Sequence, residues 1–401
     1  MSFREPSLSA ASKTVSVSVF AALQARIDTY QEAGGELIPL QIGDTFLGPS
    51  PAVLAAASEP TGLSVYGAIS GLPELRHVLA ERLVESGHAT VRGPSEVHVG
   101  VGCTHALFCA ARAVLDAGDD VLVVTPHWPL ITGVFQMVGA VPVEVPLTQG
   151  LFEAPRIDIA RALERAVTPR TRGIYFSTPS NPDGYVFSAA DLEAVAAVAV
   201  AHNLWVFSDE VYADFVYDGR HEPFANVPGM AGRTITGHSL SKSHALAGAR
   251  IGYVTAPEHV IDATRRVSNH TVYNVPVGMQ RLAHCAILTG GAFLEAARST
   301  YRDARDKTVQ ALLQRGIPHR VPRGGSFVFV ELASRLGGHS VQRLLEVAVD
   351  RGVLLAPGLA FGKAHGTSAR LCFTGVPVRD VLLGIERLAQ ALDALSLEDP
   401  S

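Results

Sequence analysis

The sequence has 401 residues, of which 47% are hydrophobic and 18% charged, so it is long and apolar enough for a globular protein with one large and one smaller domain. Lys and Arg number 33 against 38 Asp and Glu, and the net charge of −5 comes without a long run of either sign. This balance argues against nucleic acid and anionic membranes as partners and favours small molecules.

The start of the chain and the cysteines give no sign of export or of a metal site. The first ~15 residues show no clear periodicity, so we expect a loose tail, and no stretch approaches the ~20 apolar residues of a membrane span. The cysteines form no Cys-x-x-Cys pair and no complete zinc-ligand set; they are Cys103, Cys109, Cys285 and Cys372, with His105 and His284 near two of them. We expect no disulfides, no metal and a cytoplasmic location.

Short apolar runs alternate with helical patterns through the middle of the chain. Strands are predicted at residues 96–101, 120–126, 172–179 and 204–210, with helices from about Thr104, from about Pro129 and over residues 191–203. Because the runs are apolar on both faces, this order predicts an α/β fold with a largely parallel, buried sheet. Ligands of such folds lie at the carboxyl ends of the strands.

After about residue 315 the pattern changes to a separate α+β unit that begins with Pro and Gly. We therefore divide the chain into an N-terminal segment 1–45 that contributes to a small domain, a large domain 46–314, and a C-terminal small domain 315–401.

Several polar residues follow the predicted strands, and each has an ordinary structural explanation beside a functional one. Gly100 and Gly102 precede a helix, so they form either a simple turn or a phosphate site at a helix N-terminus. Trp128 follows a strand and either packs in the core or stacks on a ligand ring.

Polar residues near the later predicted strands also have both a structural and a functional explanation. Asn181 lies in the turn sequence STPSNPDG. Asp209 is either a helix N-cap or a site carboxylate, with Tyr212 on the same side if a helical turn follows. Arg370 lies in an apolar strand pattern, where an inward-facing guanidinium needs an anion and an outward-facing one is merely solvated.

Residues 238–253, HSLSKSHALAGARIGY, place Lys242 among serines in a small-residue stretch and Arg250 eight positions later. Lysine is unfavourable to bury without a partner, so Lys242 is either solvated or chemically occupied.

Together these segments resemble the class I/II aminotransferases, which are fold-type I pyridoxal-phosphate enzymes. The resemblance runs from about residue 36 to 390 and follows the family's order: YGAISGLPELR, the glycine turn, PHW, NPDG, SDEVY, SLSKSHALAGARIGY and ARLCF. It implies pyridoxal 5′-phosphate as cofactor and transfer of an amino group from an L-α-amino acid to a 2-oxo acid.

By this resemblance Lys242 forms the Schiff base with the cofactor and then moves the proton, while Asp209 keeps the pyridine nitrogen protonated. Asn181 and Tyr212 bond the phenolic oxygen, and Trp128 stacks on the ring. The residues implied at the phosphate are Gly102, Cys103, Thr104, Ser239, Ser241 and Arg250.

The resemblance also implies a substrate site and an assembly. Arg370 pairs with the substrate carboxylate, helped by Gly43 and Asn181. The family tyrosine matched by Tyr66 reaches the phosphate of the neighbouring subunit, which implies a homodimer.

The chain departs from the family at NPDG, where Asp183 replaces the usual threonine, at the GVGCTHA turn, and at Asp44 and Thr45. One hypothesis is that Asp44 or Thr45 meets a polar or cationic substrate side chain; a local turn cap explains Asp44 equally well. His244 is expected to pack rather than to face the site.

Three other functions share parts of this pattern. A same-fold enzyme that catalyses β-elimination or oxygen-dependent oxidation shares all these residues and stays open. A non-catalytic regulatory domain is disfavoured because the full set of catalytic residues is present. A nicotinamide oxidoreductase is disfavoured because GVGCTH lacks the third glycine of a dinucleotide turn.

Overall fold

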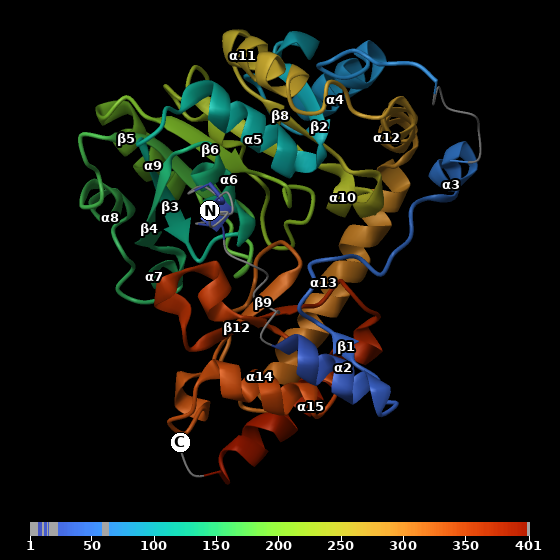
Figure 1. The fold of residues 1–401 in the computed structure, drawn as a ribbon, viewed down its shortest axis with the longest axis vertical. Coiled ribbons are helices and arrows are strands. Elements are labelled where there is room, and N and C mark those ends of the chain that lie inside the picture. Colours follow the sequence, from blue (N-terminus) through green and yellow to red (C-terminus); the bar gives the residue numbers. More distant parts are fainter. Residues whose placement is uncertain (1–6, 10–11, 14, 16–22, 58–63, 399–401) are drawn as a thin grey trace, which may run out of the picture.

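The computed structural model describes residues 7–9, 12–13, 15, 23–57 and 64–398. The loose tail predicted for the first 15 residues therefore falls mostly outside the described residues. Figure 1 shows a larger unit with a central sheet and a smaller unit beneath it, with the long helix α13 (Gly291–Gln314) running between them.

A seven-stranded sheet forms the centre of the large unit, with strand order β2-β8-β7-β6-β5-β3-β4. Its neighbours pair in parallel except at β8, which is antiparallel to both β2 and β7. The strands are β2 (Val97–Val101), β3 (Asp120–Thr125), β4 (Val141–Pro146), β5 (Thr171–Ser177), β6 (Trp205–Asp209), β7 (Thr234–Ser239) and β8 (Ile251–Thr255). The prediction of a largely parallel, buried sheet is confirmed, and the four predicted strands match β2, β3, β5 and β6 within two residues.

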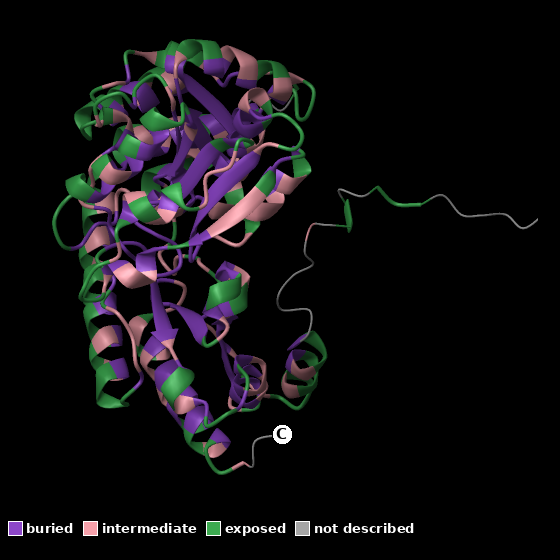
Figure 2. Ribbon diagram, turned by 90° about the vertical axis from the view of Figure 1, so that its left-hand side faces the viewer, coloured by how far each residue is buried: buried purple, intermediate pink, exposed green. Residues whose placement is uncertain are grey.

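Alternating residues of the central strands pack into two different cores, as a two-faced sheet requires. Val121 and Val123 of β3 face α5 (Gly102–Val114), α6 (Leu130–Met137) and α11 (Glu258–Asn269). Leu122 and Val124 face α8 (Ile159–Glu164) and α9 (Ala189–Ala201) on the other side. Figure 2 shows the resulting layers, with buried strands inside and exposed outer helix faces.

Five further helices of the described chain belong to the large unit. They are α3 (Pro51–Ala57), α4 (Pro73–Glu85), α7 (Thr148–Leu151), α10 (Leu240–Ser243) and α12 (Val277–Thr289). Within the described residues, no helix combines the length and the apolar character that a membrane crossing needs.

The small unit is built from distant parts of the chain. Strands β9 (Phe327–Glu331), β11 (Ala356–Pro357) and β12 (Ser368–Cys372) form an antiparallel sheet, while β1 (Ile38–Pro39) pairs in parallel with β10 (Val353–Leu354). Helices α2 (Gln24–Glu32), α14 (Val341–Val349) and α15 (Val378–Leu395) surround them.

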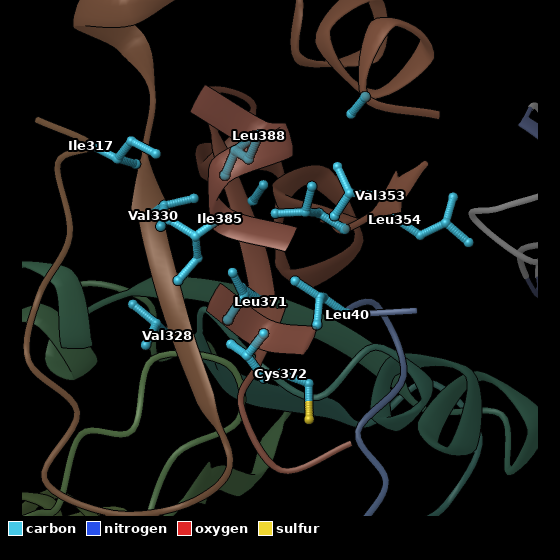
Figure 3. Packing of buried hydrophobic residues seen from close by; sticks show 14 of the residues in the cluster. Leu40, Ile317, Val328, Val330, Val353, Leu354, Leu371, Cys372, Ile385 and Leu388 are labelled. Carbon is cyan, nitrogen blue, oxygen red and sulfur yellow. The ribbon is translucent and has the colours of Figure 1, made fainter. Parts of the chain in front are cut away.

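One apolar cluster holds this unit together (Figure 3). Leu40 from the N-terminal segment packs with Val330 of β9, Leu371 of β12 and Leu388 of α15, all of them buried. Helix α13 adds Tyr301 and other residues to the same cluster. The N-terminal segment is thereby fixed beside β12, which matters for the site below.

A buried carboxylate ties the end of β6 to two loops. Glu210 Oε2 accepts hydrogen bonds from Nε2 of His88 at 3.1 Å and of His221 at 2.7 Å, and Oε1 accepts from the Ser208 hydroxyl and the Phe224 amide. The three side chains also have the proximity of metal ligands, but both carboxylate oxygens are already satisfied. Although burial opposes ionisation, the imidazoles hold the pKa of Glu210 well below its usual value.

We predict that Glu210→Gln lowers the free energy of unfolding by about 1–3 kcal/mol at neutral pH, since an amide NH2 would face two imidazole N–H donors. Because the native pKa is depressed, the carboxylate stabilises the fold above its unfolded value and loses this effect as pH falls below it. Urea titrations from pH 7 to pH 4 measure the difference. It should shrink toward acid, whereas Glu193→Gln on the exposed side of α9 should change little at any pH.

Candidate active site

A cavity opens at the carboxyl ends of β5, β6 and β7, where an α/β fold places its ligand. Its lining includes Cys103, Thr104, Trp128, Asn181, Asp209, Tyr212, Ser239, Ser241, Lys242 and Arg250, so ten of the predicted site residues lie together. A neighbouring cleft shares Trp128, Asn181, Tyr212 and Lys242 with this cavity and adds Gly43 and Arg370. Residues separated by more than 300 positions thus border one continuous space.

Lys242 lies on the single-turn helix α10, which begins directly after β7. The Ser239 hydroxyl accepts the Ser241 amide hydrogen at 3.1 Å and so caps this turn. The Lys242 ammonium donates to the carbonyl of Gly43 on the N-terminal segment. Burial lowers the pKa of Lys242, and the nearby Asp44 carboxylate opposes this shift. The amine is therefore held partly out of water at the junction of the two units, and its burial favours the neutral, nucleophilic form relative to an exposed lysine.

Asp209 ends β6 and is 8% exposed. Its Oδ2 accepts a hydrogen bond from the Tyr175 hydroxyl at 2.8 Å, and its Oδ1 accepts from the Val211 amide at 3.3 Å. No helix begins here, since turns follow the strand, so the N-cap explanation is wrong. Burial raises the pKa of Asp209 to about 6, against the effect of the Tyr175 hydrogen bond. A cationic ligand atom beside this carboxylate would favour its ionised form.

Tyr175 was missed by the sequence analysis. It lies in the apolar run RGIYFSTP, where a tyrosine looks like one more core aromatic, and its side chain is fully buried. The sequence did contain one indication of this contact: a tyrosine within a buried strand carries a hydroxyl, and a buried Tyr hydroxyl usually has a hydrogen-bond partner.

One end of the cavity has the features of an anion site. The predicted helix after β2 begins at Gly102, two residues earlier than expected, so its first amides belong to Gly102, Cys103 and Thr104. Gly102 has φ +75°, and a Cβ at this position would overlap the Arg250 guanidinium. Arg250 itself adopts a left-handed backbone, φ 53°, and donates to the Ala247 carbonyl at 3.0 Å. The Gly102 amide donates to the Arg250 carbonyl at 2.7 Å, so it is the Cys103 and Thr104 amides, two serine hydroxyls and a guanidinium that converge here.

Arg370 of β12 faces inward, which decides between its two sequence-based alternatives. It donates to Asn181 Oδ1 at 2.8 Å and to the Gln41 carbonyl at 2.6 Å. Its guanidinium lies 4.1 Å from the ring centroid of Phe327 and 4.8 Å from that of Phe361. Burial lowers the pKa of Arg370 to about 10, and no described residue accepts a hydrogen bond from its Nε. An anionic ligand beside Arg370 would stabilise the charged guanidinium and could accept a hydrogen bond from its Nε.

Tyr66 does not join the cavity within one chain. Its side chain is 84% exposed and its ring meets that of Tyr273 edge-on, with centroids 5.1 Å apart. His244 is buried against Ser243 and Gly290, as expected of a packing residue.

The positions that depart from the family have different surroundings. Asp183 is buried and accepts from the Thr148 hydroxyl and the Tyr185 amide. The Thr45 hydroxyl bonds the Tyr301 hydroxyl, whereas the exposed Asp44 side chain accepts from the adjacent Thr45 amide. The Asp44 carboxylate is exposed and acts electrostatically on Lys242.

We predict that Asp209→Asn stabilises the ligand-free protein by roughly 2 kcal/mol at pH 7.5. The unfolded carboxyl ionises near 3.8 and the native one near 6, so wild-type stability falls as pH rises through this interval, while the amide does not titrate. Denaturant titrations at pH 4, 5, 6 and 7.5 measure the difference. A gain in stability that is the same at every pH would contradict the raised pKa of Asp209.

Comparison with known proteins agrees with this geometry. Residues 35–388 match the family described as aminotransferase class I and II. The chain is 35% identical over 372 residues to the arginine–pyruvate transaminase AruH of Pseudomonas aeruginosa, covering 91% of each chain. It is 33% identical to the aspartate/prephenate aminotransferase of Thermus thermophilus, covering 86% of this chain and 89% of that one.

Solved structures give the same result. The Thermus thermophilus aspartate aminotransferase with maleate superposes with a TM-score of 0.88 at 29% identity, over 96% of this chain and all of that one. N-succinyldiaminopimelate aminotransferase from Mycobacterium tuberculosis gives 0.87 at 30% identity, over 96% and 100%. None of these relatives is named as a lyase or an oxidase, so β-elimination and oxidation receive no support. The chain belongs to the class I/II aminotransferase family and is a fold-type I, pyridoxal-phosphate-dependent aminotransferase that transfers the amino group of an α-amino acid to a 2-oxo acid.

Proposed function

We propose that this aminotransferase acts through Lys242, with pyridoxal 5′-phosphate held between α5, β6 and α10. The observation that carries the proposal is the partly buried Lys242 amine in one cavity with Asp209 and Arg250. When bound, the cofactor supplies an aldehyde that condenses with amines and a ring that accepts electrons from Cα. The Lys242 Nζ would hold this group at rest and, once the substrate amine takes its place, would be positioned to move the proton from Cα.

The residues around the cavity fit the parts of this cofactor. The Cys103 and Thr104 amides at the start of α5 can approach a phosphate beside the Arg250 guanidinium, with Ser239 and Ser241 as further donors. Trp128 offers a flat face for the ring, and Asn181 and Tyr212 offer donors to its phenolic oxygen. The ionised Asp209 holds a proton on the ring nitrogen.

The substrate carboxylate belongs beside Arg370 in this arrangement. A planar guanidinium suits a carboxylate with two parallel hydrogen bonds, and Asn181 and the backbone of Gly43 lie beside the same cleft. This supports L-α-amino acids as donors and 2-oxo acids as acceptors.

We also propose a homodimer in the cytoplasm. Tyr66 and Tyr273 form an exposed aromatic pair, next to the exposed Val65 and Val272, and such a patch is better buried against a second copy. Tyr66 of one copy would then reach the phosphate bound by the other. The proposed domains remain residues 1–45 with 315–401 and residues 46–314, with α13 as the connection.

The donor side chain is proposed to be cationic or polar. The exposed Asp44 carboxylate lies near Lys242, and the relative with 35% identity is named as an arginine–pyruvate transaminase.

The first test follows the visible absorption of the purified protein while a panel of L-amino acids is added without oxygen. We expect one donor to abolish the yellow band and a 2-oxo acid to restore it. Lys242→Ala should lower turnover by about 10³-fold or more, because the amine that moves the proton is lost. Full activity of this variant, or ammonia or peroxide as products, would contradict the proposal.

A second test concerns Asp44. We predict that Asp44→Asn lowers kcat/KM for arginine about 2- to 5-fold, the range of an exposed ion pair, and leaves the neutral isostere citrulline unchanged. Steady-state kinetics with the two donors check this. An equal loss for both substrates would assign Asp44 a purely structural role.

A further inference from the structure

Asp209 and Tyr175 come from neighbouring strands and meet on one face of the sheet. Strands β5 and β6 run in parallel, with Ser177 opposite Asp209 and Tyr175 opposite Phe207. Tyr175 therefore lies two positions back from Asp209 on the adjacent strand, within diagonal reach of it. Its ring packs with Phe135, which holds the phenol in place.

The surroundings of Asp209 make the Tyr175 hydroxyl its main side-chain contact. Among the described residues, no Lys, Arg or His forms an ion pair with Asp209, and its other hydrogen bond comes from the Val211 amide. The groups that act on it electrostatically, Glu210, Cys103 and Tyr212, carry no positive charge. A single neutral hydroxyl therefore offsets part of the desolvation of this carboxylate.

We propose that Tyr175 is a positioning residue for the aminotransferase reaction: it fixes the Asp209 carboxylate through one oxygen and keeps it ionised, so that the carboxylate can hold the proton on the cofactor's ring nitrogen. The inference rests on the proposed cofactor role of Asp209. Burial and the neighbouring carboxylate raise the pKa of Tyr175 well above its usual value, so the phenol stays a neutral donor.

The variant Tyr175→Phe removes only the oxygen and keeps the ring. Tyr185→Phe is the matched control, because the Tyr185 hydroxyl also donates to an aspartate, Asp191, at 2.8 Å, and its side chain is likewise buried. Neither Tyr185 nor Asp191 lines the cavity.

The first measurement uses the cofactor-free protein with ¹³Cγ-labelled aspartate, in which Asp209→Asn identifies the resonance. The titration midpoint of Asp209 should lie near 6 in the wild type, rise by about one unit in Tyr175→Phe, and stay unchanged in Tyr185→Phe. Incorporation of 3,5-difluorotyrosine at position 175 strengthens the donor and should move the midpoint down. This second variant also keeps the test valid if the phenylalanine variant folds poorly.

The second measurement uses the holoenzyme with ¹⁵N-labelled pyridoxal phosphate. The ring nitrogen should be protonated at neutral pH in the wild type and in Tyr185→Phe, and partly deprotonated in Tyr175→Phe. In the last variant kcat should fall about 10-fold with KM little changed, since Tyr175 does not line the cavity and would not contact the substrate.

An unchanged Asp209 midpoint in Tyr175→Phe would overturn the proposal. A shifted midpoint with an unchanged ring nitrogen and kcat would also overturn it, because the bond would then be only structural. Failure of the proposed function is distinguishable: the wild type would not bind the cofactor or exchange amino groups, whereas the titration in the cofactor-free protein would still report on Tyr175.

Discussion

Desolvation of charged side chains is the constraint on which this site depends. Lys242, Asp209 and Arg370 are all withdrawn from water, and burial shifts the pKa of each toward the neutral form: down for the lysine, up to about 6 for the aspartate, and down to about 10 for the arginine. A ligand that brings an aldehyde, a ring cation and a carboxylate would meet a complementary group at each point. The protein thus holds its reactive groups in place before the ligand arrives, and they need little rearrangement when it binds.

The fold keeps these groups in position through hydrogen bonds that cross between chain segments. The carbonyls of Gln41 and Gly43 accept from Arg370 and Lys242, and Asn181 of the large unit accepts from Arg370. Leu40 anchors the start of this segment in the apolar cluster of the small unit. The site therefore depends on the packing of the small unit as well as on the sheet.

Asp209 and Glu210 are adjacent in the sequence, but their carboxylates have different hydrogen-bond partners. Asp209 accepts from one neutral hydroxyl and one amide and can accept a further hydrogen bond from a ligand, whereas Glu210 is satisfied on both oxygens by four donors. Adjacent residues at the end of one strand thus differ in the hydrogen-bonding capacity that they leave for a ligand.

The sequence alone determined the largely parallel sheet, because buried parallel strands are apolar on both faces. It also identified most of the residues that line the cavity, because the polar residues that follow such strands meet at one edge of the sheet. It left undecided whether Arg370 faces inward and whether Asp209 caps a helix or belongs to the site. It also passed over Tyr175, because a pattern of apolar residues does not report which hydroxyl meets which carboxylate on the next strand. These points were decided by tertiary structure, since strand register, the crossing of residues 40–43 over the cleft and the burial of each charge arise only when distant segments pack together.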